Sequence, residues 1–171
     1  MRHNLHMYIL SGMSFAGKSV LARAISYAKQ VEIVDPDAVA HAKGLGLHGE
    51  FLSATVWRAI HHDAEDQAKR LLCSGKSVVY DTTAFNKQQR DALREIAKAC
   101  GATPVIIIVS ITREEAFKRW QANTISKQRA LVHSEDFQMC ADEFTFPTHD
   151  EEYLIYRAGE NMLAWIENNL Q

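Results

Sequence analysis

The eight residues from Gly12 to Ser19 have the types and spacing of a loop that binds nucleotide phosphates, G-x-x-x-x-G-K-[ST]. Gly12 and Gly17 permit backbone angles that a Cβ would penalise, so the backbone N–H groups can turn towards phosphate oxygens. Lys18 offers a mobile cation to the β- and γ-phosphates, and the Ser19 hydroxyl suits Mg²⁺. The residues that we predict to bind ATP here are Gly12, Met13, Ser14, Phe15, Ala16, Gly17, Lys18, Ser19 and Val20.

The segments on both sides of this loop have the pattern that the motif requires. His6–Leu10 is short, mostly apolar and rich in strand-forming residues, so it predicts a buried strand. After Ser19, apolar residues recur at helical spacing, and the positive end of that helix would point at the phosphates. The order of strand, glycine loop and helix favours a phosphate site over a chance glycine-rich turn.

The rest of the chain alternates between strand-like and helix-like stretches, which is typical of an α/β domain with a parallel sheet. We predict further strands at 31–34, 77–80, 105–109 and 153–156, and helices at 50–74, 87–100, after the cap Thr112, 134–143 and 161–170. The segment 123–132 is polar and is predicted to be irregular. Right-handed crossovers would then place the site at the carboxyl ends of the strands.

Composition limits the class of protein. The chain has 171 residues, of which 47% are hydrophobic, and a net charge of −2 that gives no global attraction to nucleic acid or anionic membrane. Three cysteines without metal or redox spacing favour free thiols in a reducing compartment. No apolar run reaches membrane-spanning length, and the N-terminus is polar. We expect one domain over residues 1–171, a cytoplasmic location, no membrane contact and no obligate protein partner.

Two carboxylates, Asp35 and Asp37, follow the second predicted strand and should face the ligand crevice. If this segment is extended, residues two apart point the same way. Asp35 would then serve Mg²⁺ together with Ser19, and Asp37 would orient and deprotonate an acceptor hydroxyl. The alternative is that one or both cap a helix that starts near Pro36.

A third carboxylate, Asp81, ends the third predicted strand. It could hold the metal, as an aspartate in this position does in many nucleotide-binding proteins. It could instead bind the acceptor with the hydroxyls of Thr82 and Thr83, or merely form a turn. We place Asp81, Thr82 and Thr83 on the acceptor side and leave open whether Asp35 or Asp81 serves the metal.

Transfer of a phosphoryl group also needs cations near the charge that develops on it. Arg119, Lys127 and Arg129 lie in or beside a short polar segment, 121–133, with the composition of a lid that excludes water. We predict that Arg119 and Lys127 bind ATP and that Arg129 is catalytic, together with Lys18 and Asp37. A solvated basic stretch is the alternative.

The histidines and tryptophans give weaker signals. His61-His62-Asp63 invites a metal interpretation, but neighbours on a helix point to different faces, so we expect surface histidines. Trp57, Trp120 and Trp165 are expected to pack on helix faces.

The whole chain resembles the small P-loop kinases of the polynucleotide-kinase-like group, with its zeta-toxin and chloramphenicol-phosphotransferase relatives. Asp81-Thr82-Thr83 followed by Arg90 is similar to that group's D-[AT]-[TN]…R element, and the match continues through 90–101. Residues 144–151 are similar to its F-x-x-P-x-x-x-E segment.

This resemblance implies a three-layer P-loop NTPase fold, with a five-stranded parallel sheet, helices on both faces and a short lid over an AAA-type ATP site. It implies ATP and Mg²⁺ as cofactors, transfer of the γ-phosphoryl group to a hydroxyl, Asp37 as general base and Arg90 on the substrate side. Asp35-Pro36-Asp37 also looks like the D-x-D of shikimate- and gluconate-type kinases.

The acceptor remains open between a small molecule and a nucleic-acid end. A polynucleotide 5′-hydroxyl kinase is an alternative, although Ala40 stands where that group carries an arginine. A nucleotide-binding switch without phosphotransfer is another, but residues 86–89, Asn-Lys-Gln-Gln, lack the aspartate of a guanine-specific N-K-x-D element.

Overall fold

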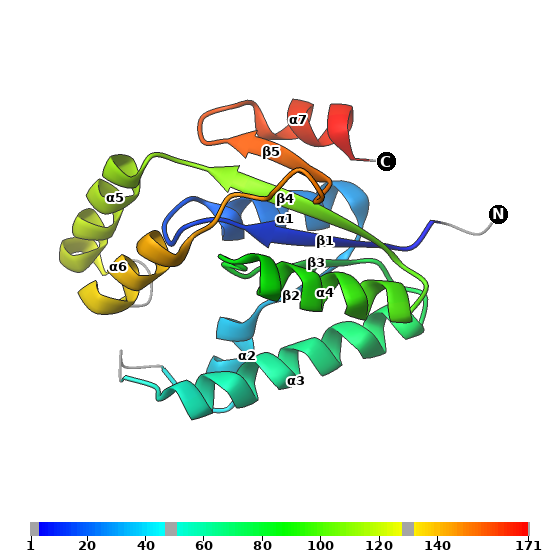
Figure 1. Cartoon of the computed structure of the whole chain (residues 1–171), viewed down its shortest axis with the longest axis horizontal. Helices are drawn as coiled ribbons and strands as arrows, with labels where there is room; N and C mark the ends of the chain where they lie inside the picture. The colour runs from blue at the N-terminus through cyan, green and yellow to red at the C-terminus, as the bar shows by residue number, and fades with distance from the viewer. Residues whose placement is uncertain (1–3, 47–50, 128–131, 171) are drawn as a thin grey trace.

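The computed structural model describes residues 4–46, 51–127 and 132–170 (Figure 1). Five strands form one sheet in the order β2-β3-β1-β4-β5, and every neighbouring pair is parallel. The strands are β1 (His6–Ser11), β2 (Glu32–Val34), β3 (Val78–Tyr80), β4 (Thr103–Ser110) and β5 (Tyr153–Arg157). The predicted P-loop fold with a five-stranded parallel sheet is confirmed.

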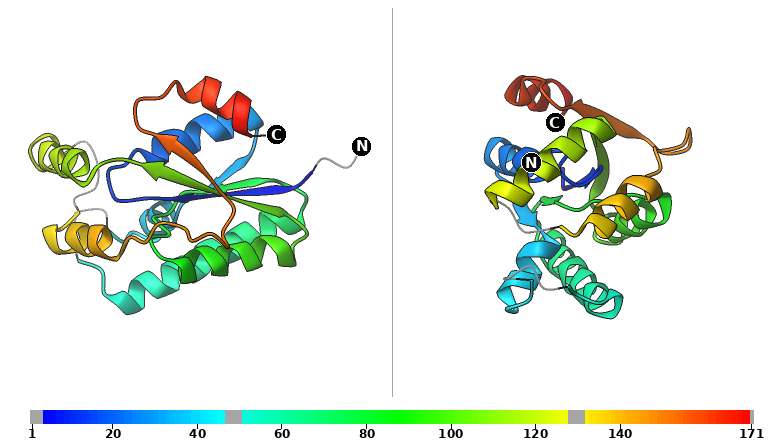
Figure 2. Two further views of the ribbon diagram at one scale, coloured as in Figure 1. Left: turned by 45° about the horizontal axis from the view of Figure 1, so that its top comes forward. Right: turned by 90° about the vertical axis from the view of Figure 1, so that its left-hand side faces the viewer.

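Helices cover both faces of this sheet (Figures 1 and 2). Along β1, Tyr8 and Leu10 point into a core shared with α1 (Lys18–Lys29) and α7 (Met162–Asn169). Met7 and Ile9 alternate with them and point into a second core, shared with α3 (Ala54–Cys73) and α4 (Lys87–Ala99). The central strands are therefore buried on both faces, which explains the unbroken apolar run in β4.

Three further helices lie towards the carboxyl ends of the strands. They are α2 (Pro36–Ala42), α5 (Arg113–Ser126) and α6 (Ser134–Glu143). In Figure 1 α5 and α6 stand side by side beyond the tip of β4. These helices frame the edge of the sheet where the chemistry was predicted.

Several helix starts follow the predicted capping chemistry. Thr112 accepts a hydrogen bond from the N–H of Glu115 at 3.2 Å and begins α5. The helix predicted from residue 50 begins instead at Ala54, where Ser53 accepts from the N–H of Val56. Residue 50 itself lies outside the described residues.

The prediction of irregular structure from residue 123 is wrong for its first part, because α5 continues to Ser126. Asn123 is buried there, and its carbonyl accepts the N–H of Lys127, whose left-handed backbone ends the helix. Within the described residues, none of the helices is long and apolar enough to cross a bilayer.

Candidate active site

The loop between β1 and α1 has the backbone geometry that its glycines predict. Gly12 has φ +154°, and a Cβ there would lie 2.6 Å from the carbonyl oxygen of Val109. Its N–H donates to the carbonyl of Thr83 at 2.9 Å, so the loop begins wedged between β4 and the end of β3. Gly17, at φ +102°, leads into the N-terminus of α1. Only glycine fits at the first of these positions.

Lys18 folds back over this loop. Its Nζ donates to the carbonyls of Gly12 and Met13 at 3.0 and 2.7 Å, and the residue is only 9% exposed. The loop carbonyls thus hold the ammonium group at the N-terminus of α1. A phosphate bound in the loop would compete with these carbonyls for the Lys18 ammonium group.

Asp35 occupies the position that the capping alternative describes. It precedes α2, and its Oδ1 accepts the N–H of Asp37 at 2.9 Å. Asp37 is therefore helical, and the premise that both carboxylates lie on an extended segment is wrong. Residues two apart on a helix point in different directions, because a turn takes 3.6 residues.

Asp37 nevertheless lies close enough to Lys18 of the loop, and to Asp81, for their charges to affect it. Burial and the nearby carboxylate of Asp81 raise its pKa above the ordinary aspartate value, while His41, His61 and Lys18 oppose the rise. The start of α2 thus brings Asp37 within electrostatic range of the loop lysine and of Asp81 at the end of β3.

Asp81 is 7% exposed at the end of β3, and its N–H donates to the carbonyl of Val34 in β2. The nearby hydroxyl of Ser19 lowers the pKa of this carboxyl, which opposes the rise caused by burial and by Asp35. Three oxygen-bearing side chains, those of Ser19, Asp35 and Asp81, therefore share one region.

These oxygen donors fit Mg²⁺, a hard cation that prefers carboxylate, hydroxyl and water ligands. Within the described residues, no three histidine, cysteine or acidic side chains form a group that could hold a metal by themselves. Mg²⁺ is commonly held by one or two protein groups together with substrate phosphates and water. The donor set fits a metal that arrives with a nucleotide.

Arg119 reaches the loop from α5. Its Nη1 donates to the carbonyl of Phe15 at 3.3 Å and its Nε to Glu115 at 3.1 Å. Phe15, at φ +64°, also contacts Phe137 of α6, with ring centroids 6.3 Å apart. Lys127 ends α5, whereas Arg129 lies outside the described residues, as does part of the predicted lid.

A cleft of about 460 Å³ begins next to Arg119. It is lined by Ser110, Ile111, Thr112, Glu115, Arg119, Arg157 and Ala158. It therefore lies where β4 and β5 end and α5 begins. Arg119 lines this cleft and also donates to the phosphate-binding loop, so the two lie on either side of one side chain.

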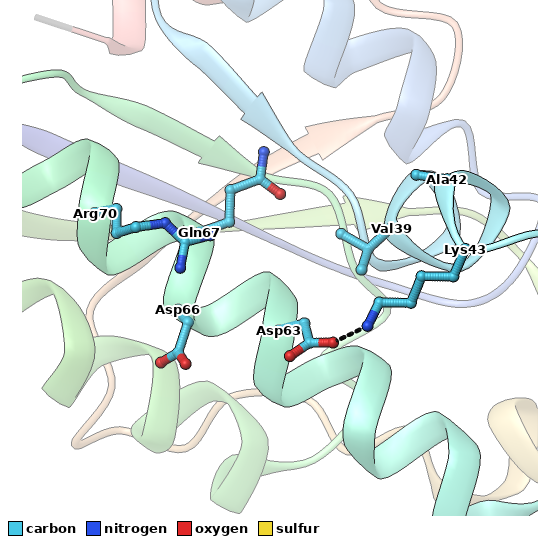
Figure 3. Close-up of a pocket in the computed structure, with 7 residues that line it drawn as sticks. All are labelled: Val39, Ala42, Lys43, Asp63, Asp66, Gln67 and Arg70. Atoms are coloured by element: carbon cyan, nitrogen blue, oxygen red, sulfur yellow. Dashed lines mark hydrogen bonds and ion pairs between the residues drawn. The ribbon is translucent and has the colours of Figure 1, made fainter.

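A second cleft, of about 380 Å³, lies between α2 and α3 (Figure 3). Its lining residues are Val39, Ala42, Lys43, Asp63, Asp66, Gln67 and Arg70. Lys43 and Asp63 form an ion pair across it. None of the predicted site residues lines this cleft, so it is separate from the phosphate site.

A family model described as an AAA domain matches residues 7–147. The chain belongs to this AAA domain family. The match begins in β1 and ends after α6, so it includes the phosphate-binding loop, the three aspartates and Arg119.

Solved structures share the fold of this AAA domain at low sequence identity. A candidate kinase of Chloroflexus aurantiacus superposes with a TM-score of 0.79 and 16% identity, over 99% of this chain and 100% of its own. A sugar kinase of Janibacter superposes with a TM-score of 0.70 and 16% identity, over 96% of this chain and 91% of its own. Chaetomium thermophilum Kti12, solved with ADP-AlF3, gives 0.71 and 16%, over 95% of each chain. No curated protein sequence matches the chain.

Arg90 of the AAA domain lies in its interior rather than at the surface of the site. The side chain is fully buried, and Glu151 receives its Nε and Nη2 at 2.8 and 2.9 Å. Its Nη1 donates to the carbonyl of Thr145 at 2.9 Å. This pairing joins α4 to the segment before β5, so the described contacts of Arg90 are structural. The fully buried position corrects the expectation of a substrate-facing arginine.

Thr82 and Thr83 lie between Asp81 and the start of α4. Both are half-buried, and the carbonyl of Thr83 is the acceptor that holds Gly12. Their backbone thus positions the phosphate-binding loop. A contact of their hydroxyls with an acceptor stays a prediction.

His61 is a residue near the candidate site that the sequence-based interpretation placed on the surface. It is half-buried on α3, with its ring centroid 6.0 Å from that of Trp57. Burial lowers its pKa, while Glu65 and Asp37 oppose that shift. Trp57, His61 and Glu65 follow one another at four-residue intervals, the spacing of one helix face. That spacing is the signal that could have identified them.

Proposed function

We propose that this AAA domain is an ATP-dependent kinase that transfers the γ-phosphoryl group of ATP to a hydroxyl of a small molecule. The observation that carries the proposal is the place of Asp37. A nucleotide-binding loop alone needs no carboxylate beside its lysine and its metal-binding groups. Here a partly buried carboxylate lies within electrostatic range of both Lys18 and Asp81.

Different residues around the loop bind the different parts of ATP, the phosphoryl donor. The backbone of 12–19 and Lys18 hold the β- and γ-phosphates, with α1 adding its positive end. The adenosine part extends into the cleft beside Arg119, between the ends of β4 and β5. Ser19, with Asp81 or Asp35, holds Mg²⁺, which supplies charge neutralisation on the phosphates. Lys127 and Arg129 add positive charge from the lid.

The acceptor side centres on Asp37. The carboxylate orients the acceptor hydroxyl and takes its proton as the oxygen attacks the γ-phosphorus. A raised pKa makes the carboxylate a stronger base, which suits this role. Trp57, His61 and Glu65 extend the acceptor region along α3.

The structural neighbour from Janibacter, named as a sugar kinase, supports a small hydroxylic acceptor through its fold. The net charge of −2 gives no general attraction to a nucleic-acid end. A small polyhydroxylic molecule is therefore the acceptor class that we propose first.

A second function, nucleotide hydrolysis coupled to a conformational change, has one observation in its favour. Kti12 superposes on this chain about as well as the sugar kinase does, and its structure contains ADP-AlF3. In that function water replaces the acceptor, and ADP would form at the same rate with or without added hydroxyl compounds.

The experiment is an acceptor screen with purified protein, ATP and Mg²⁺. ADP release is followed with sugars, sugar acids, nucleosides and a 5′-hydroxyl oligonucleotide, each against an acceptor-free reaction. A kinase gives ADP release that depends on one acceptor class, with phosphorylated product seen by mass spectrometry. The Lys18→Ala variant is the control for a contaminating activity, since it should abolish turnover.

A further inference from the structure

Two cysteines meet at the far ends of the two helices that share one face of the sheet. Cys73 is the last residue of α3, and Cys100 directly follows α4. Their Sγ atoms lie 2.9 Å apart. Both helices run in the same direction and end on the same side of the molecule, on the right in Figure 1.

We propose that Cys73 and Cys100 are a redox site, which forms a reversible intramolecular disulfide by exchange with a small-molecule disulfide of the glutathione class. A disulfide needs a sulfur separation of about 2.05 Å, so the two sulfurs would have to approach by only about 0.9 Å. Cys73 is exposed, so a reagent can reach the pair. The cysteines are free thiols, as the sequence predicts, but their spacing does not reveal this pair, because 27 residues separate the two positions.

The third cysteine does not belong to this site. Cys140 is buried in α6 rather than at the ends of α3 and α4. The pair therefore has a defined intramolecular product, and Cys140 offers a matched control.

The exchange takes two steps, and the exposure and the pKa of the two cysteines decide which one reacts first. Cys73 is the more exposed sulfur, so its thiolate attacks the small disulfide first and one reduced glutathione leaves. Burial and the neighbouring Cys73 raise the pKa of Cys100 to about 11, which keeps it protonated until the mixed disulfide forms beside it. Cys100 then loses its proton, attacks the Cys73 sulfur and expels the second glutathione.

The exchange balances without another reagent. Two protein thiols lose two protons and two electrons, one S–S bond forms in the protein, and one S–S bond breaks in oxidised glutathione to give two thiols. Reduced glutathione or dithiothreitol in excess reverses the reaction.

The new bond would join α3 to α4 and close a loop that contains β3 and Asp81. It would therefore restrict α3, the helix that carries His61, at the end away from the candidate active site. A covalent constraint of this kind removes freedom from the unfolded chain and raises thermal stability.

The test treats the full-length protein with oxidised glutathione and analyses it by intact mass after alkylation of free thiols. The proposal expects one remaining alkylated thiol, no retained glutathione, and a Tm about 5–10 °C above that of the reduced protein. The Cys140→Ala variant should behave in the same way, with no thiol left to alkylate.

Single variants test the order of the steps. Cys100→Ala should stop at the mixed disulfide and retain one glutathione, whereas Cys73→Ala should react at least about tenfold more slowly at position 100. After oxidation of the wild-type protein, a retained glutathione, a disulfide-linked dimer, or an unchanged number of alkylated thiols would each overturn the proposal.

Discussion

Ser19 of the phosphate-binding loop lies beside Asp81 at the end of β3, where its hydroxyl lowers the pKa of that carboxyl. The start of α1 and the end of β3 therefore bring two oxygen donors into one region. The same strand end holds the loop itself, because the carbonyl of Thr83 accepts the N–H of Gly12.

The Asp81→Asn variant should need more Mg²⁺ to bind ATP. An amide keeps the shape of the side chain but removes a charge that stabilises the cation. The Mg²⁺ concentration that gives half of the maximal thermal shift with ATP should therefore rise at least about tenfold. Thermal shift with ATP at a series of Mg²⁺ concentrations measures it. Asp66→Asn, which changes a half-buried carboxylate of α3 in the separate cleft between α2 and α3, is the matched control. An unchanged Mg²⁺ requirement in the Asp81 variant would remove this residue from the metal site.

The Gly12→Ala variant should lose stability through one defined clash. The new Cβ would lie 2.6 Å from the Val109 carbonyl, at a φ that other residues rarely adopt. We expect a loss of about 3 kcal/mol in the free energy of unfolding, measured by urea denaturation. Gly101→Ala separates the two causes, because Gly101 has φ +73° with no atom near the added Cβ, and should lose only about 1 kcal/mol. Equal losses in the two variants would contradict the clash.

The buried pair of Arg90 and Glu151 should give the protein an acid-sensitive contribution to stability. The hydrogen bond from Arg90 holds the pKa of Glu151 below its ordinary value of 4.5. The stabilisation is therefore complete above pH 4.5 and is lost as the pH falls through the lower pKa of the folded state.

The Glu151→Gln variant should remove most of this pH dependence and lose about 3–5 kcal/mol near neutral pH, because it leaves a buried guanidinium without its counter-charge. Unfolding free energies from pH 7 to pH 3 for both proteins provide the measurement. Parallel curves for wild type and variant would show that another carboxylate carries the acid response.

The His61→Gln variant should reduce acceptor use and leave ATP binding unchanged. His61 is half-buried near Asp37, whereas its neighbour His62 has a side chain that is 68% exposed. We expect a fall of about tenfold in kcat/KM for the acceptor, with little change for His62→Gln. If the two variants behave alike, the face of α3 that carries Trp57 and Glu65 does not belong to the acceptor region.

The phosphate-binding loop and the alternation of strands and helices could be predicted because both are written in local sequence. Their signals depend on glycine spacing and on hydrophobic periodicity, which the final structure keeps. Asp37 was placed near the loop because it follows the second strand. The separate premise of an extended segment at 35–37 proved wrong, since Pro36 starts a helix.

Contacts between distant segments could not be read in this way. The Arg90–Glu151 pair joins positions 61 residues apart, and its burial becomes visible only when α4 packs beside the segment before β5. His61 was expected on the surface, but it is half-buried and lies within electrostatic range of Asp37 at the start of α2. The four-residue spacing of Trp57, His61 and Glu65 gave a local signal, whereas the Arg90–Glu151 pair depends on how distant elements pack.

The central claim, that Asp37 makes this nucleotide-binding domain a phosphotransferase, is tested most directly by ADP release in the wild type and in Asp37→Asn, with and without the acceptor found by the screen. The account predicts acceptor-dependent release in the wild type and a loss of at least about 100-fold in the variant, with ATP binding intact by thermal shift. Full transfer activity in Asp37→Asn, or wild-type ADP release that no acceptor changes, would contradict it.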